Sequence, residues 1–203
     1  MKLFNFLFCN LALCFSVVGN ASAPSTVSDR LVFVKNMVTN IVQRLIDLAN
    51  NDSITDKGAA TLSIISDNCD IKFVADHIVG PALKTFSPIQ KKQYYDCFQV
   101  IFNKSASIFL QKCKKAKFKV TQCKMKTNGD ATVTVLLDTK TGPMTCAVVF
   151  HYNTTNNDYK AVDFIFNGIS ILAIQKEVLH SIWKQSGNDP AVFIQKLQSK
   201  HGV

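Results

Sequence analysis

Apolar residues in the first half of the chain recur at the three-and-four spacing of amphipathic helices. The strongest pattern predicts a helix over residues 27–50, with Ser28 and Asp29 as its start signal. Shorter patterns predict helices over 55–66 and 70–79, the second ending at Gly80 and Pro81. The apolar face of the first helix consists of Leu31, Val34, Val38, Ile41, Leu45 and Leu48.

A long helix is predicted from Ser87 to about Lys112. Ser87 can cap it, Pro88 fits the first helical position, and Gln90 completes a capping box. One face of this helix is largely aromatic and comprises Tyr94, Phe98, Ile101, Phe102, Ser105 and Phe109.

The period then changes from helical to alternating, which indicates strands. Four strands are predicted, at 117–121, 131–138, 145–152 and 159–166. Short polar connections such as Asn128-Gly129 separate them, so we expect an antiparallel meander.

Two helices are predicted after the sheet. Ser170 can cap the first, and Gly187 ends it. Asp189 and Pro190 begin the second. The apolar residues of the first are Ile171, Ile174, Val178, Leu179, Ile182 and Trp183. We expect the second to bury Val192, Phe193 and Leu197. The fold class is therefore α+β, with N-terminal helices, a four-stranded meander sheet and a C-terminal helix pair packed on one side of the curled sheet.

Length and composition fit one packed domain. The chain has 203 residues, of which 47% are apolar and 18% charged, and its net charge is +9. This excludes a disordered chain. No stretch after residue 23 is apolar and long enough to span a bilayer.

The first 21 residues have the pattern of a secretory signal peptide: one lysine, an apolar run, then small residues. We expect cleavage after Ala21, with Ala23 as the alternative, because Pro24 would follow a cut at Ala23. An uncleaved anchor is the other interpretation. Residues 22–203 would then form a single exported domain.

Five cysteines remain in that domain, and an odd number in an oxidising compartment allows two disulfides and one thiol. Their pairing stays open, with Cys113–Cys123 as a short-loop candidate. The five are Cys69, Cys97, Cys113, Cys123 and Cys146.

The sequence offers no recognisable nucleophile motif and no cysteine–histidine spacing typical of zinc, so we expect neither an enzyme nor a metal site. The basic run Lys112–Lys119 could contact an anionic membrane, although a solvated helix end followed by an alternating strand explains it as well. Export argues against nucleic acid as the partner of this run.

Two stretches of the chain carry specific motifs. One is the helix opening Ser87-Pro88-x-Gln90-x-x-x-Tyr94-x-x-x-Phe98. The other is the strand and turn over 159–170, with Tyr159, Lys160, Asp163, Gly168 and Ser170. Both resemble, in register, motifs of the MlaC (toluene-tolerance) family of periplasmic phospholipid-binding proteins, and their order and spacing fit nearly the whole chain after the signal peptide.

The resemblance implies a cystatin/NTF2-like fold with an apolar cavity between helices and sheet, and a phospholipid as cargo rather than a cofactor. It implies a periplasmic shuttle that exchanges diacyl phospholipid with an inner-membrane ABC-type transport complex and an outer-membrane lipid complex, and so maintains lipid asymmetry. An exported interaction protein of the same fold without ligand remains an alternative, and an exported hydrolase is a further one.

From helix face and motif we predict eleven lipid-binding residues. They come from the long helix, the sheet and the helix that follows it: Tyr94, Phe98, Phe102, Phe109, Val133, Val135, Val148, Phe150, Phe164, Phe166 and Ile171.

Overall fold

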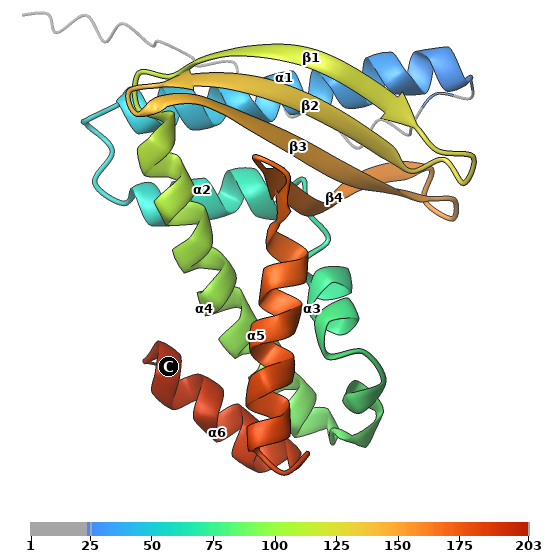
Figure 1. The fold of residues 1–203 in the computed structure, drawn as a ribbon, viewed down its shortest axis with the longest axis vertical. Helices are drawn as coiled ribbons and strands as arrows, with labels where there is room; N and C mark the ends of the chain where they lie inside the picture. The colour runs from blue at the N-terminus through green and yellow to red at the C-terminus, as the bar shows by residue number, and fades with distance from the viewer. Residues whose placement is uncertain (1–23, 25, 203) are drawn as a thin grey trace, which may run out of the picture.

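A curled antiparallel sheet with strand order β1-β2-β3-β4-β5 forms one end of the computed structural model, which describes residues 24 and 26–202 (Figure 1). The predicted signal peptide lies outside the described residues. Neighbouring strands pair in sequence order, as in a meander. The strands are β1 (Lys117–Met125), β2 (Ala131–Thr139), β3 (Gly142–Asn153), β4 (Asp158–Phe166) and β5 (Ile169–Ser170).

The helices lie against one face of this sheet and extend away from it (Figure 1). Among the described residues, no helix is sufficiently long and apolar to cross a membrane. The helices are α1 (Val27–Asn50), α2 (Lys57–Ser66), α3 (Ile71–Val79), the 3-10 turn η1 (Gly80–Thr85), α4 (Pro88–Cys113), α5 (Ile171–Gln185) and α6 (Pro190–His201).

The inner face of the sheet and α1 form a first apolar core, which we call the sheet core. Alternation along β2 turns Val133, Val135 and Leu137 to this face, and none of the three is exposed. Val34 and Val38 of α1 are equally buried in the same cluster. The inward-facing residues of β2 and the apolar face of α1 therefore pack in one layer.

A second apolar cluster, the helical core, joins α3, α4, α5 and α6 away from the sheet. Tyr94 lies at its centre, where its ring is 6.1 Å from both Phe86 and Phe193. The Tyr94 hydroxyl donates a hydrogen bond to the Ala75 carbonyl at 2.8 Å, so its buried polar atom is satisfied.

Helix α4 belongs to both cores because of its length. Its 26 residues rise about 39 Å at 1.5 Å per residue. It begins as the sequence predicts, since Ser87 and Gln90 form a complete capping box around Pro88.

Strand β4 is hydrogen-bonded to helical segments that come before and after it in the chain. The Ala161 N–H donates to the Asn68 carbonyl, and the Ala161 carbonyl accepts from the Asp70 N–H, so the linker between α2 and α3 is bonded to this strand. Asp163 accepts from the Ser170 hydroxyl at 2.6 Å and from the Leu172 N–H at 3.0 Å.

The start of α5 is fixed by the turn that precedes it. Asn167 and Gly168 both have positive φ, as a two-residue hairpin of the primed type requires. Ser170, which Asp163 holds, then caps α5 by accepting from the Ala173 N–H.

The α+β class and the meander are confirmed, with three differences in detail. Within the described residues the sheet has five strands rather than four, because Ile169 and Ser170 pair with the end of β4. Thr26 caps α1 instead of Ser28 or Asp29, its hydroxyl accepting from the Asp29 N–H. Val192 was predicted to be buried but is 39% exposed.

We expect the variant Asp163→Ala to lower the free energy of unfolding by about 2 kcal/mol, because it removes two hydrogen bonds that hold α5 to β4. Denaturant unfolding followed by circular dichroism measures this. The matched control Asp138→Ala removes an exposed carboxylate and should shift stability by less than about 0.5 kcal/mol. Equal midpoints for the two variants would contradict the assigned role of Asp163.

Candidate functional site

Four phenylalanines between α4 and β4 are only half-buried, although fully buried residues surround them. They are Phe102 and Phe109 of α4 and Phe164 and Phe166 of β4. We call this set the apolar seam. Phenylalanine between two layers of a domain is usually covered by its own chain. Apolar area left open at this position can be covered by a ligand.

Strand register explains why the two β4 residues of the seam face the helices. Phe164 pairs with Val148 and Phe166 pairs with Cys146, and both partners lie on the buried face of β3. A bulge next to Phe150 shifts the register before this point, so the alternation after it differs from that of the first half of β4.

Helix and strand meet at one ring pair in the seam. The centroids of Phe109 and Phe166 are 5.0 Å apart and the rings are tilted by 39°, which is a favourable aromatic contact. Phe102 lies two turns earlier on the same face of α4 and packs against both cores.

The structure separates the eleven predicted residues into three groups. Phe102, Phe109, Phe164 and Phe166 are the half-buried residues of the seam, in which Phe109 contacts Phe166, and Ile171 is half-buried at the start of α5. The sheet core holds a second group in which no residue is more than 5% exposed: Val133, Val135, Val148 and Phe150.

Tyr94 and Phe98 form the third group, because they pack inside the helical core rather than in the sheet core. Their exposed fractions are 0% and 2%. The chain's own side chains already cover them. They share a helix face with Phe102, but the two cores contact different stretches of that face.

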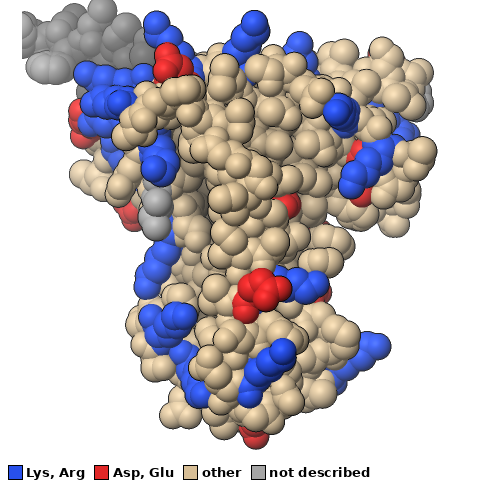
Figure 2. Space-filling view, in the orientation of Figure 1, with Lys and Arg blue, Asp and Glu red and all other residues tan. Residues whose placement is uncertain are grey.

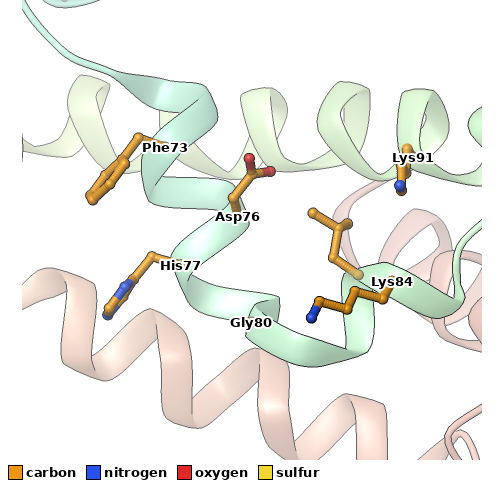
Figure 3. A pocket seen from close by; sticks show the side chains of 7 residues that line it. Phe73, Asp76, His77, Gly80, Lys84 and Lys91 are labelled. Carbon is orange, nitrogen blue, oxygen red and sulfur yellow. The ribbon is translucent and has the colours of Figure 1, made fainter. Parts of the chain in front are cut away.

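Two surface hollows lie elsewhere, and none of the eleven residues lines either of them. One, of about 390 Å³, is formed by α3, η1 and the start of α4 (Figure 3). Phe73, Asp76 and His77 border it from α3, and Lys84 and Lys91 from the other two elements. The other, of about 460 Å³, lies between α5 and α6.

One apolar surface was missed by the sequence interpretation. Ile174 and Val178 belong to the apolar face predicted for the first C-terminal helix, yet they are 45% and 36% exposed. Val178 also borders the hollow between α5 and α6. Their spacing of four is the same whether a partner covers the face or not, so the pattern alone carried no signal of exposure.

Most cysteines in the described part of the chain are buried thiols with little reactivity. Each of the five in the described part of the chain is unpaired, so the candidate Cys113–Cys123 bridge is not formed. Burial raises the pKa of Cys69, Cys113 and Cys146 to about 12, which keeps these thiols protonated at neutral pH. In the same residues, no group of three or more His, Cys, Asp or Glu could hold a metal ion.

Asp163, the acid of the strand motif, has a structural role. Both of its oxygens accept hydrogen bonds from the start of α5. The motif residue Tyr159 is fully buried and donates to the Gly129 carbonyl at 2.9 Å. Lys160 donates to the Asp67 carbonyl at 2.8 Å. The residues that carry the family resemblance therefore hold the walls of the site in place.

The family model for the MlaC protein matches residues 17–199. This chain belongs to the MlaC family. Among solved structures, a phospholipid-binding protein from Ralstonia solanacearum, in complex with a phospholipid, is similar with a TM-score of 0.69. The identity is 15%, over 90% of this chain and 98% of that one, so the likeness concerns the fold. No curated protein matches the chain in sequence.

The apolar cavity between helices and sheet stays a prediction; the seam lies between α4 and β4, two of the elements that this prediction involves. Its walls come from the two motifs: α4 begins at the capping box, and β4 contains the strand motif. The motif residues hold the backbone of α4 and β4 in place. Phe164 and Phe166 lie between residues of the strand motif, and Phe102 and Phe109 follow the other motif on α4.

We expect Cys123 to react faster with a thiol reagent than the other four cysteines of the folded protein at about pH 8, because it is the least buried of the five. Burial raises the pKa of its thiol as well, so the reaction should be slower than that of a free thiol. Cys123 is half-buried, with its thiol 3.6 Å from the Leu31 carbonyl, whereas the other four are no more than 8% exposed. Peptide mapping by mass spectrometry after brief alkylation measures each site separately. The variant Cys123→Ser should then show almost no labelling of the remaining four, and fast labelling of Cys113 or Cys146 would contradict their burial.

Proposed function

We propose that this MlaC-family protein binds one diacyl phospholipid with its acyl chains in the apolar seam, and carries it through the periplasm. The observation that carries the proposal is the half-buried state of Phe102, Phe109, Phe164 and Phe166 between α4 and β4. The phospholipid in the structurally similar Ralstonia protein supports the same ligand class.

The physical requirement on such a carrier is set by the membrane rather than by water. Two acyl chains contain about 30 methylene groups, each worth about 0.8 kcal/mol when removed from water. A site that recovered this entire free energy would exceed known affinities and would never release its ligand. A bilayer already shields the chains, so the seam needs only to match it, which apolar contacts without a catalytic group can achieve.

The seam residues suit that task because they are apolar and their cover is incomplete. Phe109 and Phe166 contact each other through ring faces and edges. An acyl chain inserted between the two rings would contact both of them. When the lipid leaves, the rings can contact each other again, so the protein without lipid loses little apolar contact. We include Ile171, which is half-buried at the start of α5, in the proposed site.

We further propose that docking at membrane complexes, an inner-membrane ABC-type transporter and an outer-membrane lipid complex, drives the exchange and so maintains lipid asymmetry. The family membership supports this role. The buried thiols and the structural use of Asp163 argue against a hydrolase, since neither is available as a nucleophile or base.

One observation favours a second candidate, an interaction protein of the same fold that binds no lipid. The rings of Phe109 and Phe166 touch, so the chain's own side chains fill that part of the seam. This candidate predicts a purified protein without lipid.

Lipid content of the purified protein distinguishes the two. We expect native mass spectrometry, followed by organic extraction, to find about one diacyl phospholipid per chain, since one seam has room for one ligand. We expect Phe164→Asp to lower the retained lipid at least about tenfold, because a carboxylate in the seam loses its hydration when acyl chains cover it.

Phe73→Asp is the matched control, because Phe73 is 38% exposed and lies outside the seam. It should retain its lipid. Val148→Trp is a second variant, at the buried cross-strand partner of Phe164; the larger side chain should displace Phe164 and lower the retained lipid. A wild-type protein that carries no lipid and takes none up from vesicles would reject the carrier and favour the interaction protein.

A further inference from the structure

Lysines gather at one end of the molecule, where α4 ends and the sheet begins (Figure 2). The group, which we call the basic end, consists of Lys112, Lys115, Lys117, Lys119 and Lys140, all exposed. Lys117 pairs with Asp138 across β1 and β2, and this register brings the β2–β3 turn containing Lys140 beside the start of β1.

Positive charges outnumber negative ones at the basic end. Among the described residues, none of its five lysines forms an ion pair. Two acids lie close to this end: Asp138 is the cross-strand partner of Lys117, and Asp52 pairs with Lys57 and Lys114 at 3.5 and 3.0 Å. The field at this end is therefore positive.

The backbone at the basic end is fixed in an unusual conformation. Lys115 has φ of 60°, in the left-handed region that lysine rarely adopts, and its N–H donates to the Asn50 side chain at 2.8 Å. The chain thus turns from α4 into β1 over very few residues, so the lysines before and after the turn lie close together along the chain.

Two ordinary explanations account for part of this surface. A lysine in the last turn of a helix complements its dipole, which covers Lys112. Lysines on an edge strand prevent pairing with other strands, which covers Lys117 and Lys119 of β1. Neither explains Lys115 or Lys140, nor the apolar residue among them: Leu136, which pairs with Lys119, is 38% exposed on the outer face.

We propose that the basic end docks on an anionic lipid bilayer, with the lysines on the headgroups and Leu136 at the interface. Exposed lysines around an exposed apolar side chain are the chemistry that an anionic membrane surface recognises. The inference rests on the proposed function, because the basic end borders the apolar seam: Lys112 follows Phe109 by three residues on α4. Docking there brings the seam to the membrane that supplies or receives its lipid.

The test compares vesicle binding of two variants with equal charge loss. In the first, Lys112, Lys115, Lys117 and Lys119 are each replaced by Gln. In the control, the same substitution is made in the helical region at four exposed lysines that form no ion pair in the described structure: Lys84, Lys176, Lys184 and Lys200. Protein expressed from the full chain is co-sedimented with phosphatidylcholine vesicles that do or do not contain phosphatidylglycerol.

We expect the wild type to bind the anionic vesicles and to be released as salt approaches about 1 M. The basic-end variant should bind about 100-fold more weakly, and the control variant close to wild type, since each lysine near an anionic surface adds a similar increment. Equal weakening in the two variants, or equal binding to neutral and anionic vesicles, would overturn the proposal.

Lipid content separates this inference from the proposed function. The basic-end variant should keep its co-purified phospholipid in native mass spectrometry, because no substituted residue lies in the seam. If the fourfold variant is poorly folded, Lys119→Gln with Lys140→Gln gives a milder test. These two exposed side chains form no ion pair in the described structure, and we expect about tenfold weaker binding. Unchanged binding of that double variant would also overturn the proposal.

Discussion

The set of hydrogen bonds around strand β4 is the constraint on which the rest of the structure depends. Ala161 binds the linker between α2 and α3 with both backbone groups, and Asp163 holds the start of α5 with both carboxylate oxygens. The next residues of the same strand, Phe164 and Phe166, face the helices. One strand therefore fixes the helix positions and presents half of the candidate site, so the spacing between sheet and helices is set within a few residues.

Helix α4 provides the opposite wall by passing through two cores. Its first half is anchored in the helical core by Tyr94 and Phe98, which are almost completely buried. Its second half reaches the sheet core, where Phe102 and Phe109 are covered only in part. A rigid anchor at one end and incomplete cover at the other is an arrangement in which side chains of the seam can rearrange without loss of the fold.

Much of this could be predicted from the sequence because the signals were local. Ser87 with Gln90 specified the start of α4, and the alternation in 131–138 specified a strand whose inner residues are unexposed. The short strand β5 escaped because two residues show no period. The position of Tyr94 in a separate core also escaped, because one helix face looks continuous in sequence while its packing partners change along about 39 Å. Exposure of Ile174 depends on what else packs nearby, which no periodicity records.

The free energy that a side chain can give to a ligand depends on how much of its surface the protein leaves open. Val133 and Val135 are unexposed, so they support the sheet but have no surface for an acyl chain to cover. Ile89 is 73% exposed and stands apart from both cores, so it cannot enclose a chain. The seam phenylalanines lie between these extremes and adjoin one another through Phe109 and Phe166. They combine open apolar area with a position between helix and sheet, as the proposed lipid site requires in order both to hold and to release its ligand.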